Sequence, residues 1–343
     1  MNLRHFWYGL LLCVLTTVHS HSIGVKNLHV DDLVKASDVI VIAEVAEAKA
    51  NGPAPPILFH DQALQAEAYS SDLLVRRIIK GTATDRITVR YALPITFVGL
   101  RRLEPGTRIV FLRREQDSYS PADLYYPDFP AIVPISGNEG LQAAPSDYAR
   151  IVVREMAAVI ASATASANEK SQILQVDYAL PVNDEVVAAF REGLANAQEP
   201  ELRQRLQGEL IRFGDISELP EVARLLVAST ATANQRIWLL YVIGNRVSDR
   251  RAIPALEPLL RSGDSSLRAT AVEALWHIAD PTAVHELLKS LQDPSEQVRF
   301  YAVRAFSDIA NEPGWGGPSE SEFQQHQQKY LTHWQEWAKN RAR

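Results

Sequence analysis

The residues best suited to binding a ligand lie in one stretch, 117–130, which is rich in tyrosine, aspartate and proline. These residue types predict a loop, and aromatic side chains that have no place in a core are free to contact a partner. Aromatic rings bury a large surface at low entropic cost and often dominate binding. The candidates are Tyr119, Tyr125, Tyr126 and Phe129, with Asp117, Asp123 and Asp128 interleaved.

A second set of candidate binding residues is expected on the polar faces of helices in the C-terminal half. They are Arg224, Glu257, His285 and Lys289. Rigid helices would present these side chains without an ordering cost on binding. The sequence His-Glu-Leu-Leu-Lys at 285–289 is one residue type away from a zinc-protease helix, because Lys289 takes the place of the second histidine. A protonated lysine does not ligate zinc, so we expect a polar helix face there.

Sequence motifs that would identify an enzyme are absent. The chain has no Gly-X-Ser-X-Gly elbow, no phosphate-binding glycine loop, no Cys-X-X-Cys pair and no calcium loop. Its single cysteine, Cys13, lies in the N-terminal apolar segment. His326 and His333 are seven residues apart, but no further ligands accompany them. We therefore predict no catalytic residue, no metal and no cofactor, and favour a binding protein over an enzyme.

Three arginines recur at equivalent positions and allow two interpretations. Arg236, Arg268 and Arg299 could form a basic ladder for an anionic ligand. They could instead pair with carboxylates near helix ends, such as Asp264 or Asp293. The net charge is −6, and ladders in repeat proteins are usually structural, so we favour the second interpretation.

A repeated helical pattern must position these residues. The sequence from residue 268 matches that from residue 299, and fainter copies start at 236 and 203. The matched pairs are Ala271/Ala302, Val272/Val303, Ala274/Ala305, Ile278/Ile309 and Ala279/Ala310. Such a period with helical spacing is typical of a solenoid of stacked helix pairs. We expect helix pairs over 172–318, with Asp249 and Asp280 capping second helices.

The segment 200–312 resembles HEAT repeats of the short bacterial type related to phycobilisome-lyase repeats. The matching residues are Leu267, Arg268, Ala271, Val272, Ala274, Leu275, Asp280, Pro281, Val298, Arg299, Ala302 and Val303. The resemblance implies an α-solenoid, and it does not imply lyase activity, because nothing in the sequence marks a chromophore site. A helix at 319–343 would cap the solenoid with Phe323, Tyr330, Trp334 and Trp337. Trp276, Trp315, Trp334 and Trp337 could stack on a ligand, but core or capping roles are more common.

Residues 24–136 have the pattern of a small β-barrel domain. The run 39–45 is apolar on both faces, and 87–91 alternates cleanly. Three prolines make 50–70 read as a long loop. Several short strands separated by turns favour a small closed barrel. The segment 31–113 resembles the barrel of netrin-like modules and tissue inhibitors of metalloproteinases, which implies an OB-like fold. The N-terminal cysteine that those inhibitors present to zinc has no counterpart here.

The remaining segments are short. Residues 1–20 have the features of a signal peptide, with an apolar run and a cleavage site near Ser20 and His21. The run is short for a membrane span, so we expect no membrane span after cleavage and a periplasmic or secreted protein, with an uncleaved N-terminal anchor as the alternative. Helical spacing at 146–162 predicts a bridging helix, and an Ala/Ser-rich composition at 163–171 predicts a linker.

Charge and fold class together limit the function. Neither half of the chain is basic, which argues against a nucleic-acid partner. We expect a two-domain β + α protein, exported and non-catalytic, that binds a protein or peptide on its HEAT-like solenoid, on its barrel loops or on both. The alternative is an extracytoplasmic enzyme or enzyme inhibitor that acts through the barrel loops.

Overall fold

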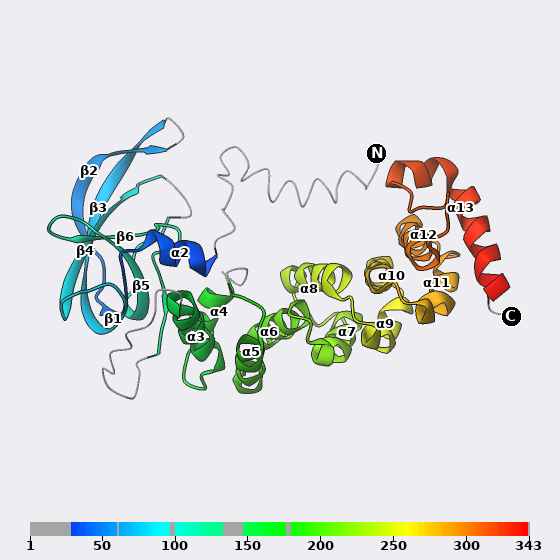
Figure 1. The fold of residues 1–343 in the computed structure, drawn as a ribbon, viewed down its shortest axis with the longest axis horizontal. Coiled ribbons are helices and arrows are strands. Elements are labelled where there is room, and N and C mark those ends of the chain that lie inside the picture. The colour runs from blue at the N-terminus through cyan, green and yellow to red at the C-terminus, as the bar shows by residue number, and fades with distance from the viewer. Residues whose placement is uncertain (1–28, 60–61, 97–99, 133–146, 176–179, 342–343) are drawn as a thin grey trace. The chain divides into compact units, whose positions relative to one another are not determined.

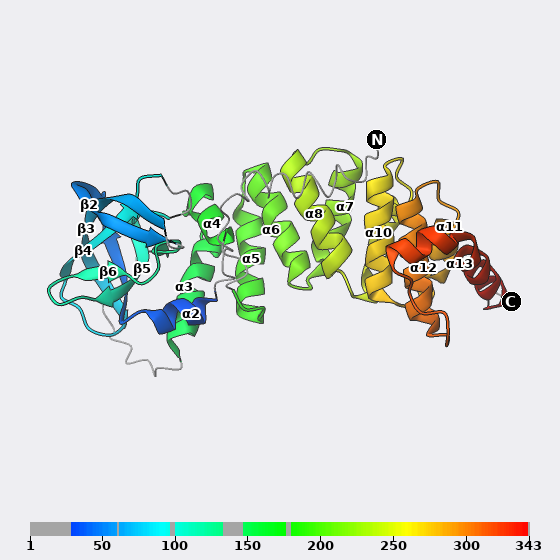
Figure 2. The same cartoon turned by 90° about the horizontal axis from the view of Figure 1, so that it is seen from above.

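The computed structural model describes residues 29–59, 62–96, 100–132, 147–175 and 180–341 (Figures 1 and 2). The chain forms two compact units, each described here by itself. Unit 1 comprises Met1–Val159 and Asn168–Pro181, and unit 2 comprises Ile160–Ala167 and Val182–Arg343. The expected signal peptide, 1–20, lies outside the described residues.

Unit 1 is built on a seven-stranded sheet. Its strands are β1 (Val39–Val45), β2 (Lys49–Phe59), β3 (Gln62–Lys80), β4 (Arg86–Pro94), β5 (Gly106–Arg114), β6 (Tyr119–Pro121) and β7 (Asp128–Pro130). Its helices are α2 (Val30–Ala36), most of α3 (Tyr148–Ala161), and α4 (Ala167–Leu174), of which all but the first residue belongs to this unit. Five consecutive residues of β1, from position 39 to 43, are completely buried. The unbroken apolar run of β1 is therefore explained by burial on both of its faces.

In unit 1, successive strand pairings form a closed circuit that starts and ends at β1. β1 pairs antiparallel with β3 on one side and with β5 on the other. β3 pairs with β4, β4 runs parallel to β6, and β6 pairs with β5. β2 and β7 are outside this circuit and pair with β3 and β5 respectively. Apolar side chains of β1, β3, β4 and β5 pack together into one buried cluster.

Residues 50–70, expected to be a long loop, instead form most of a hairpin between β2 and β3. The prolines that indicated a loop, Pro53, Pro55 and Pro56, all lie on β2, which pairs with β3 alone. Proline lacks the N–H donor that an inner strand needs, but an edge strand tolerates it. The prolines also protect this edge against pairing with another chain.

The segment expected to be a linker, 163–171, is partly helical, because Ala167–Leu174 forms α4. The amide of Gln172 attaches this helix to the sheet region. Its Nε2 donates to Glu104 at 2.7 Å, and its Oε1 accepts from Nη1 of Arg108 at 2.8 Å. Alanine and serine are common both in linkers and in helices that pack, so composition alone was misleading here.

Unit 2 is entirely helical in its described residues. Its α-helices are α5 (Asp184–Asn196), α6 (Pro200–Arg212), α7 (Leu219–Val227), α8 (Ala233–Arg246), α9 (Ile253–Leu260), α10 (Ser265–Ile278), α11 (Val284–Ser290), α12 (Glu296–Ala310) and α13 (Glu320–Arg341). Short 3-10 turns at Ile216–Glu218, Arg250–Ala252 and Pro281–Ala283 lead into α7, α9 and α11. Side chains of Asp249 and Asp280 cap the second and third of these turns, as expected.

The helices of unit 2 form two rows. The long helices α6, α8, α10 and α12 pack against one another in sequence, and the short helices α7, α9 and α11 form the other row (Figures 1 and 2). One buried apolar cluster runs through both rows, from Ile211 to Ala338. The expected solenoid of helix pairs is therefore present in this part of the chain.

The repeated arginines are structural, which confirms the interpretation favoured from the sequence. Arg236 pairs with Asp264 and donates to the carbonyl of Leu226. Arg268 contacts both carboxylate oxygens of Asp293, at 2.7 and 3.0 Å, and donates to two carbonyls after α9. Arg299 donates to the backbone after α11 in the same way. Each arginine thus satisfies carbonyls left free at the end of a short helix.

Helix α13 covers the last apolar face of the solenoid. Phe323 and Trp334 are completely buried, and Tyr330 nearly so. The Trp334 ring stacks on Phe306 of α12, with ring centroids 6.0 Å apart. His333 of α13 stacks on Trp315 at 3.5 Å, which attaches the preceding loop to the helix. These tryptophans therefore belong to the core and its edge.

Candidate functional site

The aromatic stretch 117–130 is not one exposed loop. Tyr119 lies in β6, and Phe129 lies in β7, where it is 1% exposed and packs edge-on against Phe111. Phe129 is therefore a core residue, contrary to the loop placement expected from the sequence. Tyr125 and Tyr126 are half-buried in a turn in which both backbone amides donate to Asp123. Burial raises the pKa of both phenols.

Asp128, expected among the loop residues, is the centre of a buried polar network. Its side chain is 1% exposed and accepts hydrogen bonds from Arg108, which is 4% exposed, and from the Glu104 amide. Burial raises the pKa of Asp128, while Arg108 favours its ionised form. Because Arg108 also binds Gln172, the network fixes β5, β7 and α4 together. We interpret it as structural, since its groups are satisfied by one another.

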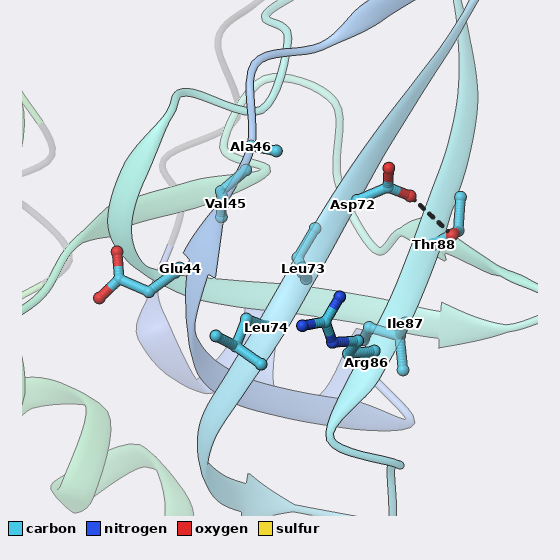
Figure 3. A pocket seen from close by; sticks show the side chains of 9 residues that line it. All are labelled: Glu44, Val45, Ala46, Asp72, Leu73, Leu74, Arg86, Ile87 and Thr88. Carbon is cyan, nitrogen blue, oxygen red and sulfur yellow. Dashed lines mark hydrogen bonds between the residues drawn. The ribbon is translucent and has the colours of Figure 1, made fainter.

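A groove is lined by residues of β1, β3 and β4 and by Ala46, which follows β1 (Figure 3). It has a volume of about 540 Å³ and carries charges of both signs. Asp72 is held by Lys49 at 3.0 Å and by Thr88 at 2.8 Å, and hydrogen bonding by Lys49 lowers its pKa. Glu44 accepts from Thr107 at 2.9 Å. The lining also includes Arg86 and apolar Val45, Ala46, Leu73, Leu74 and Ile87.

The four candidates on helices all lie on the short row, and each has a partner in its own helix. Arg224 of α7 binds both oxygens of Glu221. Glu257 of α9 pairs with Arg261. On α11, Lys289 lies 2.9 Å and His285 3.9 Å from Glu286. These are exposed local pairs on three separate helices, a pattern that contributes little to stability and forms no convergent site.

The long helices present a different surface, which sequence reasoning missed. We call it the α8–α10–α12 surface and define it by Ile237, Tyr241, Glu273, Trp276, His277, Tyr301, Arg304 and Asp308. Ile237 and Tyr241 of α8 are 47% and 45% exposed, among the most exposed large apolar side chains of the described residues. They are four residues apart, so they occupy one face of the helix. An exposed apolar pair beside aromatic and charged side chains is typical of a protein-binding surface.

Trp276 organises the α10–α12 part of this surface. Its Nε1 donates to Asp308 at 2.6 Å. The guanidinium of Arg304 lies over the indole, 4.4 Å from the ring centroid, and the Tyr301 ring is stacked with it at 6.2 Å. These contacts fix the side chains before any partner binds, and pre-organised tryptophan, tyrosine and arginine are the residues that most often dominate binding energy.

Glu273 lies at the junction of α8 and α10. Gly244 of α8 makes room for it, because a Cβ at that glycine would stand 2.5 Å from Oε2 of Glu273. Burial raises the pKa of Glu273, although a hydrogen bond from Tyr301 and the proximity of His277 favour its ionised form. His277 donates from Nδ1 to the Gly244 carbonyl at 2.6 Å. A glycine inside a helix is the one sequence signal that marks this site.

Among the described residues, no three His, Cys, Asp or Glu side chains form a group that would hold a metal ion. In the same part of the chain, no helix combines the length and apolar content needed to cross a membrane.

Comparison with known families supports the helical architecture. Residues 253–314, which extend from α9 past the end of α12, match a family model described as HEAT repeats. No curated protein matches the chain. The match covers well under half of the sequence, so it characterises the helical region and leaves the sheet of unit 1 without a family. Helices α10 and α12, which carry part of the α8–α10–α12 surface, lie within the matched residues, and α8 precedes them.

Proposed function

We propose that this protein is an exported, non-catalytic binding protein that holds a protein partner on the α8–α10–α12 surface. The observation that carries the proposal is the exposure of Ile237 and Tyr241 on α8, a helix that packs against α10, which carries the ordered Trp276 cluster. A soluble repeat protein that leaves large apolar side chains next to fixed aromatic and arginine side chains has a surface suited to a partner. HEAT-type arrays commonly mediate protein interactions, which supports the same proposal.

For the sheet of unit 1 we make a separate proposal about its fold and its ligand. We infer that it is a closed, OB-like barrel, because the circuit β1–β3–β4–β6–β5 returns to β1. The parallel contact between β4 and β6, which are the third and fifth strands of the circuit in chain order, agrees with that topology. The groove of Figure 3 would be the place for a small polar ligand of the barrel. We also propose that the barrel is related to netrin-like modules and that the helical region is related to phycobilisome-lyase repeats.

Export is proposed from the N-terminal sequence. The apolar run 6–18 and the small residues near Ser20 support cleavage there and a periplasmic or secreted protein. Mass measurement of the protein purified from the source cells tests this directly, because a chain that begins at His21 is expected in the extracytoplasmic fraction. An uncleaved chain in the cytoplasmic fraction would refute it.

The binding proposal is tested by comparing two surfaces of the same solenoid. The mature chain and a double variant, Ile237→Asp with Tyr241→Ala, serve as bait for periplasmic and secreted fractions. The matched control, Arg224→Ala with Glu257→Ala, changes two exposed residues of the short row. A protein captured by the wild type is then purified, and its affinity for each bait is measured.

We expect the long-row variant to lose at least tenfold in affinity, because interface aromatic residues commonly cost above about 1.4 kcal/mol when removed. The control should bind as the wild type does. Circular dichroism of each variant checks that the fold is retained. Equal binding by the long-row variant, or loss in the control alone, would contradict the proposed surface.

A further inference from the structure

Glu273 is a half-buried carboxylate that, unlike the buried Asp128 and Glu209, has no basic partner among the described residues. Asp128 is paired with Arg108, and Glu209 of α6 is held by both Arg205 and Arg212. Glu273 interacts with the Tyr301 hydroxyl and with His277, and no lysine or arginine among the described residues forms an ion pair with it. A carboxylate removed from water without a cation is costly to the folded state.

The surroundings of Glu273 preserve this arrangement. Gly244 lacks the side chain that would displace the carboxylate, and the His277 ring is held one helical turn away by its bond to the Gly244 carbonyl. The Tyr301 ring is stacked on Trp276, so its hydroxyl is fixed where it meets Glu273. The carboxylate is thus partly accessible and held in position from both α8 and α12.

The basic side chains nearest along the long helices are already engaged. Arg304 lies over the Trp276 ring. Arg246, at the end of α8, is directed toward Tyr241, with Nη2 3.4 Å from the phenol oxygen. His277 is a cation only when protonated. The site therefore combines the carboxyl groups of Glu273 and Asp308 with aromatic rings, and this combination attracts an ammonium or guanidinium group through ion pairing and cation–π contact.

We propose that Glu273 receives a lysine or arginine side chain of the partner that docks on the α8–α10–α12 surface. The apolar stem of that side chain would lie along Tyr241, and its charged end would meet the carboxylate. This inference rests on the proposed function, and it specifies the partner as a protein segment with a basic residue next to apolar ones. Charge complementarity selects this occupant, because neither Glu273 nor the neighbouring Asp308 of this surface forms an ion pair with a basic side chain among the described residues.

The test uses the full mature chain and random 12-residue peptides displayed on phage as the probe. Peptides are selected on the wild type, and each is synthesised with its basic residues and with norleucine in their place. Binding is measured to the wild type, to Glu273→Gln, to Tyr241→Ala and to a matched control, Glu257→Gln on the short row. The glutamine keeps an oxygen that can accept from Tyr301, so the fold should be unaffected.

We expect selected peptides to be enriched in lysine or arginine. Norleucine should weaken binding to the wild type at least tenfold and to Glu273→Gln less than threefold, and Glu257→Gln should behave as the wild type. The melting temperature of free Glu273→Gln should be equal to or above that of the wild type, because the variant removes a half-buried charge that has no cationic partner. A purely structural role of Glu273 predicts a lower melting temperature instead.

Other outcomes separate the two proposals. Peptides that lose binding to Tyr241→Ala but bind Glu273→Gln as well as the wild type would overturn this inference and leave the proposed surface in place. Peptides indifferent to both variants, or no enrichment of any peptide, would overturn both. A clear drop in the melting temperature of Glu273→Gln would also overturn the inference.

Discussion

Replacing Arg268 with alanine tests whether the arginine ladder stabilises the solenoid. Arg268 makes two hydrogen bonds to the Asp293 carboxylate and two to carbonyls at Ser262 and Gly263. The side chains of Arg268 and Asp293 are 15% and 11% exposed. The change removes a charged donor from both groups and leaves a partly buried carboxylate without its cation.

The expected magnitude follows from these contacts. Removing one member of a fully buried pair costs about 3–5 kcal/mol, and an exposed pair contributes about 0–1 kcal/mol. The pair here lies nearer the buried limit, but water can reach the truncated site. We therefore expect Arg268→Ala to lower the free energy of unfolding by about 2–3 kcal/mol. In a unit of this size the melting temperature should fall by roughly 5–10 °C.

The acid dependence of the same variant gives a second measurement. Burial opposes ionisation of Asp293, but hydrogen bonds from Arg268 and the Ser295 amide outweigh it and lower its pKa. The stabilisation is then present above the ordinary carboxyl pKa and is lost as the pH falls through the lowered value. The difference between wild type and variant should therefore shrink in acid.

Urea unfolding followed by circular dichroism, from neutral to acid pH, measures both effects. Arg251→Ala is the control, because Arg251 makes an exposed pair with Asp249 and should change stability little. If Arg268→Ala were as stable as this control at neutral pH, or if its deficit were independent of pH, the ladder would not have the stabilising role assigned to it.

Three further changes test the packing of unit 2. Gly208→Leu places a side chain where even a Cβ would overlap the Trp238 ring, so a loss of about 1–3 kcal/mol is expected in urea unfolding, and unchanged stability would refute the close approach. Trp334→Ala removes a completely buried ring and should cost about 3–5 kcal/mol, whereas a loss below 1 kcal/mol would mean that α13 does not close the core. Burial and the bond to Glu322 raise the pKa of Tyr330 to about 12. Stability from the protonated phenol is thus full below pH 10 and lost as the pH rises through about 12. The alkaline absorbance of Tyr330→Phe should differ from the wild type only near pH 12, and a difference centred near pH 10 would contradict the burial.

The solenoid could be predicted because its determinants are local and repeated. Apolar spacing identified the helices, and the recurrence of Arg268 and Arg299 identified the ladder. The β2–β3 hairpin could not be predicted in the same way. Prolines occur both in loops and in edge strands, so the local sequence does not tell the two structures apart. Only the pairing of β2 with β3 shows that these prolines lie in an edge strand. Helix α4 was missed because the contacts of Gln172 are made with residues distant in sequence.

The candidate surface was harder to predict than the fold. Exposed charged residues such as Arg224 stand out in the sequence, but their partners lie one turn away in the same helix. Glu273 has an ordinary place in a helical pattern, and its lack of a basic partner is a property of three helices together. Gly244, a glycine inside a helix, was the one sequence feature that pointed to this site. Its role is clear only from the structure, where the Glu273 carboxylate occupies the space that a side chain at 244 would need.

The attachment of α4 to the sheet affects the order in which the contacts of unit 1 can form during synthesis. Unit 1 includes Asn168–Pro181, which follows a segment already assigned to unit 2. Synthesis proceeds from the N-terminus, so the hydrogen bond from Arg108 to Gln172 can form only after residue 172 has been made, well after β7 has been synthesised. The sheet therefore reaches its final set of contacts late, after the chain has entered the helical unit. For the export proposed above, such a delay would keep the contacts of unit 1 incomplete until residue 172 has been synthesised.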